Sequence, residues 1–121
     1  MRVAGGERLG RGDVDVAQVY TNFTGPAVAA LIDHGFCTIE SAGEFLTVDN
    51  LIAPNGQLPI NTAGGDLAEG FIHGMVGAAE AVRQIRGSSV NQVPGASLSL
   101  LTGGPAAPLV SSALFGSADT L

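Results

Sequence analysis

One segment, residues 61–87, constrains the fold most: NTAGGDLAEGFIHGMVGAAEAVRQIRG. Large and small residues each recur along it every three or four positions, which predicts a helix from about Leu67 to Arg86, stopped by Gly87. A glycine inside a helix costs about 1 kcal/mol relative to alanine, so close packing or a ligand is expected to compensate. We therefore predict a long buried helix with two packed faces. The large face is Leu67, Phe71, Met75, Ala78, Val82 and Ile85, and the small face is Gly70, Gly74, Gly77 and Ala81.

The start of this segment, NTAGG, predicts backbone N–H groups at the N-terminus of that helix. Such groups could stabilise an anion, an enolate or a thioester oxygen. The alternative is an ordinary glycine turn that leads into a helix. Asp66 and Glu69 would then stand in the first helical turn, where the helix dipole favours acidic residues without any role in a site.

The remaining segments alternate between helix and strand patterns. Thr24 can cap a helix that has Pro26 in its first turn, and Gly35 can end it. Glycine and proline separate the last two apolar runs, which predicts a hairpin. The chain is therefore predicted to be a small α/β unit. Its other segments are a loose start over 1–12, a strand over 14–20, β-prone residues 43–51, a loop over 53–61 with a turn at Asn55–Gly56, and strands over 96–104 and 108–116.

Composition excludes several classes of function. The net charge is −6 and all five basic residues are arginine, which argues against nucleic-acid binding. No apolar run is long enough to span a membrane, and no His, Cys, Asp and Glu have metal-ligand spacing. The single cysteine, Cys37, excludes an internal disulfide and favours a reducing cytoplasm. Hydrophobic residues make up 45% and charged residues only 13%, so some apolar surface is expected to meet another polypeptide.

Three segments resemble the thiolase superfamily. VDVAQVYTNFTGPAVAALIDHGFC is similar to the segment that carries the His-Asp-Cys-Phe motif of sterol-carrier-protein thiolases. Residues 61–87 resemble the segment with the Gly-His-Pro motif, and LSLLTGGP followed by SSALF resembles the closing hairpin with its Cys-x-Gly-Gly. The resemblance is strongest to the bacterial lipid-transfer-protein branch, which includes retro-aldolases that shorten steroid side chains as CoA thioesters. It implies the C-terminal half of a thiolase fold over residues 13–121, a mixed sheet on a long buried helix, incomplete at its N-terminus.

The departures from the thiolase motifs change the implied chemistry. Tyr20 and Phe71 stand at the two histidine positions, and Leu101 stands at the position of the acid/base cysteine. His73 falls two residues after Phe71, roughly 200° around a helix, so it does not simply replace the lost histidine. Cys37 matches an ordinary residue of the family and is expected to be structural. Claisen chemistry needs a thiolate, its activating histidine and a second cysteine, so an acyltransferase is disfavoured.

Retro-aldol cleavage of a β-hydroxyacyl-CoA needs less: a base for the β-hydroxyl and donors for the thioester enolate. The resemblance implies Tyr20 as that base, with His73 near the entrance of the site. A tyrosine pKa near 10 is high for a base, so a positive dipole would have to lower it. No cofactor is implied, because the substrate itself carries coenzyme A. The expected backbone donors are Asn61, Gly64, Gly65, Gly103 and Gly104.

Two other functions stay open. Phe71 has no hydroxyl, so the chain could be a non-catalytic thiolase-like scaffold; an acyltransferase would need a cysteine from another segment. The resemblance also implies a homodimer and a small partner subunit with an OB-like fold and a zinc ribbon. It places the protein in the bacterial cytoplasm.

Overall fold

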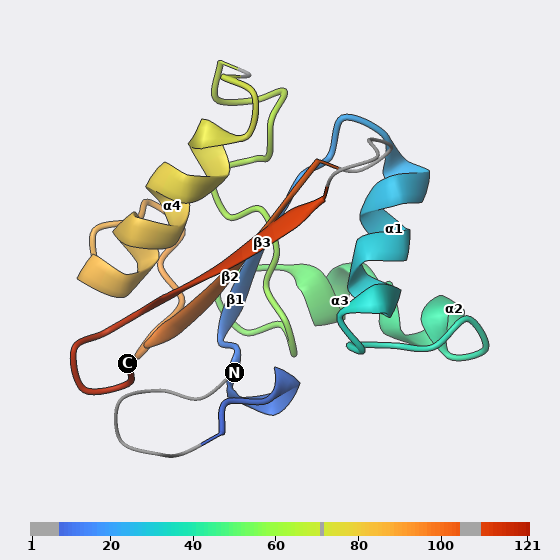
Figure 1. Cartoon of the computed structure of the whole chain (residues 1–121), viewed down its shortest axis with the longest axis horizontal. Coiled ribbons are helices and arrows are strands. Elements are labelled where there is room, and N and C mark those ends of the chain that lie inside the picture. Colours follow the sequence, from blue (N-terminus) through green and yellow to red (C-terminus); the bar gives the residue numbers. More distant parts are fainter. Residues whose placement is uncertain (1–7, 71, 105–109) are drawn as a thin grey trace.

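The computed structural model describes residues 8–70, 72–104 and 110–121. They form a mixed α/β structure, as predicted (Figure 1). The predicted loose segment 1–12 lies partly outside these residues, and the described part ends in a short 3-10 turn. The elements are η1 (Arg11–Asp13), β1 (Val16–Val19), α1 (Thr24–Asp33), α2 (Ala42–Phe45), α3 (Val48–Leu51), α4 (Met75–Arg86), β2 (Leu98–Gly103) and β3 (Ser111–Gly116).

The three strands form one sheet in the order β1-β2-β3. β1 and β2 are parallel, with Gln18 opposite Leu101, whereas β2 and β3 are antiparallel. The predicted closing hairpin is therefore confirmed, although most of its turn lies outside the described residues. Next to β1, the main chain of residues 59–61 forms a further parallel bridge, in which Ala17 pairs with Ile60.

Helices cover the sheet on two opposite sides (Figure 1). On the α1 side, alternate residues of the strands meet α1 in an apolar core, because successive side chains of a strand point to opposite faces. Thr24 begins this helix without any side-chain cap, contrary to prediction, but Gly35 follows its end with a φ of 78° as expected. The core residues are Ala17, Val19, Ala27, Leu31, Leu58 and Leu100.

On the other side, α4 packs closely against the sheet through its small face. A Cβ atom added to Gly77 would lie 2.8 Å from Leu101 Cδ1 and 3.4 Å from Gln18 Cβ. Glycine at this position therefore lets the helix approach β1 and β2, which is the packing reason expected from the sequence. The buried residues of α4 are Val76, Glu80, Ala81 and Gln84, so half of them are polar.

The long helix begins at Met75, not at Leu67, so the prediction was wrong over its first two turns. The residues before Met75 form a loop in which Gly70, His73 and Gly74 have positive φ. That conformation is incompatible with a right-handed helix. The predicted C-terminal stop at Gly87 is confirmed by its left-handed backbone.

The prediction that the large apolar face is packed was also wrong. Leu67 is 84% exposed and Met75 is 63% exposed. Exposed large apolar side chains, expected from the composition, are thus present, and they are spread over several segments of the described chain. Among the described residues, no helix is long and apolar enough to cross a membrane.

The β-prone residues 43–51 form the short helices α2 and α3, which corrects the sequence prediction. The Thr47 side chain caps α3 by accepting a hydrogen bond from the Asn50 N–H. This local hydrogen bond favours a helical turn over an extended strand. The loop that follows contains a turn over 53–55, which overlaps the turn predicted at Asn55–Gly56 by one residue.

Candidate active site

Tyr20 follows the carboxyl end of β1, and the backbone around it is fixed by three side chains. The N–H of Val19 donates to Asn61 Oδ1 at 2.7 Å, and the N–H of Thr21 donates to Asp66 Oδ2 at 2.6 Å. Between them, the N–H of Tyr20 donates to Thr102 Oγ1 at 3.4 Å. Side chains from two neighbouring segments thus set the position from which the phenol projects.

The phenol lies in an open groove of about 450 Å³ between the start of α4 and the ends of β2 and β3. Five of the predicted site residues line this groove together, although they come from three separate segments. Met75, Ala78 and Ala113 make part of the groove floor apolar. The five predicted residues are Tyr20, His73, Leu101, Gly103 and Gly104.

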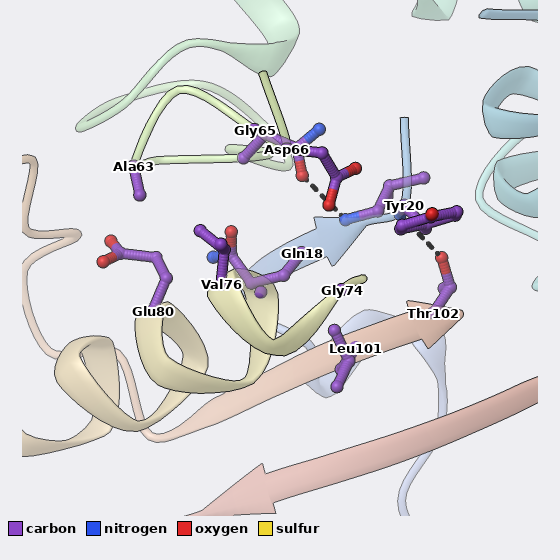
Figure 2. Close-up of a pocket in the computed structure, with 13 residues that line it drawn as sticks. Gln18, Tyr20, Ala63, Gly65, Asp66, Gly74, Val76, Glu80, Leu101 and Thr102 are labelled. Atoms are coloured by element: carbon purple, nitrogen blue, oxygen red, sulfur yellow. Dashed lines mark hydrogen bonds between the residues drawn. The ribbon is translucent and has the colours of Figure 1, made fainter. Parts of the chain in front are cut away.

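Beneath Tyr20, a second and much smaller space of about 10 Å³ separates α4 from the turn 61–66 (Figure 2). A space of this size holds about one water molecule. Asn61 and Gly65 line it, so they lie next to Tyr20 but not in the groove. Gly64 faces a third hollow, on the side of α3.

The physical basis for backbone donors at residues 61–65 was wrong, because α4 starts about ten residues later. Asn61 Oδ1 is already an acceptor for Val19, and the N–H of Gly64 donates to Asn61 O at 2.7 Å within the turn. The helix dipole therefore does not act at this turn. A donor role for Asn61, Gly64 and Gly65 stays a prediction without that support.

Two residues other than glycine have a positive φ among the described residues: Asn61 at 48° and His73 at 40°. Such backbone conformations are uncommon outside glycine, and they concentrate at functional sites. Both residues were singled out from the sequence for other reasons. The loop between them is tied to α4 by the Glu69–Arg83 ion pair, in which the Glu69 carboxylate raises the pKa of Arg83.

Three residues of the site had no signal in the sequence. Asp66 was interpreted only as an acidic residue of a helical turn, yet it is buried and accepts from both the N–H and the hydroxyl of Thr21. Thr102 supports Tyr20, and Glu80 lines the small space in Figure 2. Their roles depend on contacts between distant segments, which no local pattern encodes.

Other predicted positions lie away from the groove or outside the described residues. Cys37 is a free, buried cysteine, which agrees with a structural role. Phe71 is one of the positions that the structure does not describe. Within the described residues, no three His, Cys, Asp or Glu side chains are grouped to hold a metal ion.

Known proteins are similar to this chain in sequence and in fold. The chain is 47% identical over 96 residues to a 17-hydroxy-3-oxo-4-pregnene-20-carboxyl-CoA lyase of Mycobacterium tuberculosis. The aligned region covers 79% of this chain and 25% of that protein. It is 43% identical over 100 residues to a steroid side-chain-cleaving aldolase of Thermomonospora curvata, covering 83% of this chain and 25% of that protein. The present chain thus spans about a quarter of the length of these relatives.

A solved structure, the Ltp2-ChsH2(DUF35) aldolase, superposes with a TM-score of 0.83 at 39% identity, over 93% of this chain and 29% of that one. Residues 4–113 match the family described as Thiolase C-terminal domain-like. Both the match, which covers most of the chain, and the fold agree with the resemblance seen in the motifs. The chain therefore belongs to the thiolase C-terminal domain-like family.

Proposed function

We propose that this chain forms part of an aldolase that cleaves a β-hydroxyacyl-CoA by a retro-aldol reaction, with a steroid or related lipid as the acyl group. The observation that carries the proposal is the place of Tyr20, which projects into a groove with an apolar floor and is fixed by three side chains. The names of the relatives support the reaction class and the CoA thioester.

In this reaction, the phenolic oxygen of Tyr20 accepts the proton from the β-hydroxyl of the substrate. The Cα–Cβ bond then breaks, Cβ becomes a ketone, and the bonding electrons form a thioester enolate. Backbone N–H groups of Gly103 and Gly104 are the proposed donors to the enolate oxygen, since both residues line the groove. A proton returned to Cα completes the reaction and gives a shortened acyl-CoA.

His73 is the proposed second acid/base group of the groove, at its entrance beside Gly74. Leu101 extends the apolar floor at the position where thiolases carry a cysteine, so the proton for Cα must come from elsewhere. An imidazole can supply it near neutral pH. His73→Asn tests this role, because asparagine tolerates the positive φ of this position while removing the imidazole.

The test of the function is ketone release from 17-hydroxy-3-oxo-4-pregnene-20-carboxyl-CoA by the protein in its native assembly. Tyr20→Phe is expected to abolish release, and His73→Asn to reduce it by about a hundred-fold, within the usual range for one acid/base group. His34→Asn is the comparison variant, since His34 itself does not line the groove, although its Nε2 lies 2.8 Å from the hydroxyl of Ser112, which does. Unchanged turnover by Tyr20→Phe would remove Tyr20 from the mechanism.

A non-catalytic scaffold is the second candidate, favoured by the sequence at Phe71 and Leu101, which carry no acid or base. A scaffold would show no ketone release in any assembly. An acyltransferase is less favoured, because the only cysteine of the chain is buried and does not line the groove. Acyl trapping on a cysteine of another segment would appear as a shift in intact mass.

We also propose a homodimer and a small partner subunit with an OB-like fold and a zinc ribbon. The exposed apolar side chains of Leu67 and Ile72, in the loop before α4, support a protein contact at that loop. The similar solved structure also carries a name that joins two components, Ltp2 and ChsH2(DUF35). Light scattering of the purified protein, alone and after co-expression with such a subunit, tests this assembly.

A further inference from the structure

A network of buried polar side chains lies between α4 and the turn that supports Tyr20. Glu80, Gln84 and Thr62 are 2%, 0% and 5% exposed. Glu80 Oε1 accepts hydrogen bonds from Thr62 Oγ1 at 2.6 Å, from Ser89 Oγ at 2.5 Å and from Gln84 Nε2 at 3.2 Å. We refer to this set as the polar network: Gln18, Thr62, Glu80, Gln84, Ser89 and Asn91. The first four are buried, whereas Ser89 is half-buried and Asn91 is exposed.

Thr62 is the centre of this network. Its hydroxyl donates to Glu80 and accepts from Gln84 Nε2 at 2.9 Å and from Gln18 Nε2 at 3.2 Å. These three bonds use the one donor and both acceptor sites of a hydroxyl. The Thr62 carbonyl also accepts from Asn91 Nδ2 at 2.7 Å, so both the side chain and the main chain of this residue are held.

Two short routes lead from Thr62 to Tyr20. The neighbouring residue, Asn61, accepts from the N–H of Val19, directly before Tyr20. The second route is Gln18, on β1, whose amide reaches the Thr62 hydroxyl directly. Glu80 itself lies at the far end of the small space from Tyr20, with Val76 and Gln18 between them (Figure 2). It can therefore act on the phenol only through the two routes from Thr62.

A buried carboxylate is costly in free energy unless it is hydrogen-bonded or paired, and Glu80 Oε2 also lies 3.6 Å from the Arg83 guanidinium. Apolar replacements of buried ionic groups are nevertheless often neutral or stabilising. A fully satisfied polar network instead defines one geometry. Its six members come from β1, from the turn, from α4 and from the segment after α4. The arrangement therefore suits a positioning role better than a contribution to stability alone.

We infer that Glu80 is a positioning residue for the lyase site: through the Thr62 hydroxyl it fixes the turn 61–66 and, with it, the position of Tyr20. This inference rests on the proposed function. It predicts an effect on kcat with little change in KM, because the network touches no part of the groove that would bind substrate before reaction.

The test compares Thr62→Val with Thr62→Ser in the native assembly. Valine keeps the shape but loses three hydrogen bonds, and a misplacement of about 1 Å can cost a hundred-fold in rate, so a loss of kcat of that order is expected. Serine keeps the hydroxyl and should restore kcat to near the wild-type value. Ser99→Ala is the matched control, because Ser99 is fully buried on the same side of the sheet and its hydroxyl has no hydrogen-bond partner among the described residues.

A fluorotyrosine introduced at position 20 gives a readout that does not depend on turnover. Its fluorine NMR resonance is expected to shift or broaden in Thr62→Val and to stay unchanged in Ser99→Ala. Where Thr62→Val does not fold, Glu80→Gln replaces it: the amide keeps one acceptor oxygen but removes the charge, and kcat is expected to fall by about tenfold, as charge-assisted bonds become neutral ones.

Wild-type kcat in folded Thr62→Val or Glu80→Gln, while Tyr20→Phe is inactive, would overturn the positioning role and leave the proposed function standing. No ketone release from the wild-type assembly would instead remove the proposed function. In that case an unchanged fluorine resonance in Thr62→Val would overturn the structural link to Tyr20 as well.

Discussion

On the α1 side of the sheet, Ala17, Val19 and Leu100 pack against the apolar residues of α1, whereas on the α4 side Gln18 and Ser99 are buried beside Glu80 and Gln84. The same two strands supply both sides. The α1 side is held by apolar area removed from water, which is strong but not directional. The α4 side also buries the apolar residues Val76 and Ala81, but there side-chain hydrogen bonds are added, and these specify positions. The candidate site lies on the α4 side.

This difference separates two kinds of mutational effect. Damage to the apolar side should lower the free energy of unfolding and leave the folded protein active. Damage to the polar side should change the rate of the proposed reaction by more than it changes stability. Variants of residues on each side, measured for both the free energy of unfolding and the rate of ketone release, therefore test whether the two sides differ in this way.

The largest effect on stability is expected from Leu31→Ala. Leu31 is 3% exposed within the apolar core, and truncation of a buried leucine costs about 2–5 kcal/mol. Denaturant unfolding measures this loss, and kcat per folded molecule should stay at the wild-type value. A large fall in kcat with little loss of stability would show that the α1 side also positions the site.

Gly77→Val should affect both quantities, because Gly77 is where α4 meets the sheet. The added side chain would clash with Leu101 and Gln18, at a cost of about 1–3 kcal/mol for overpacking, and would move α4 away from Tyr20. Unfolding and ketone release are measured on the same preparation. Gly25→Ala is the matched control, since a Cβ at this position of α1 meets nothing within 4 Å.

The two sides also differ in how much of them the sequence predicts. The alternation in residues 14–20 and the helix stop at Gly35 were sufficient for β1 and α1, since both reflect local backbone preferences. The hairpin was likewise predicted by the glycine and proline residues between two apolar runs. These features need no knowledge of what lies across the sheet.

The loop 61–74 could not be predicted in the same way. Its residues have helical spacing, but Gly70, His73 and Gly74 adopt left-handed backbone conformations that the tertiary structure imposes. For the site, motif positions placed Tyr20, Leu101 and the Gly103–Gly104 pair in one groove. Thr102 and Asp66 were missed because their partners are more than forty residues away in the chain.

Gly74→Ala tests whether the start of α4 shapes the groove. Gly74 has a φ of 82°, where an L-residue costs about 1–2 kcal/mol, and its added Cβ would lie 3.5 Å from the Tyr20 ring. Gly87→Ala imposes similar backbone strain at the far end of α4, with open space around it. Equal losses of stability are expected, with a loss of ketone release only for Gly74→Ala; equal activity would show that the start of α4 does not shape the groove.

The smallest effect is expected at Glu40, an exposed residue between α1 and α2. Hydrogen bonds from its own backbone N–H and then from the Thr38 hydroxyl lower the pKa of this carboxyl. A lowered pKa in the folded state means that the charged form stabilises the fold at pH values above the ordinary glutamate pKa of about 4.3. This contribution disappears as pH falls through the lower pKa of the folded state.

Glu40→Gln should therefore unfold slightly more easily than the wild type at neutral pH. The two unfolding curves should converge in acid, and because Glu40 is far from the groove, ketone release should not change. A gap that persists at low pH would mean that the side chain acts through packing and not through its charge.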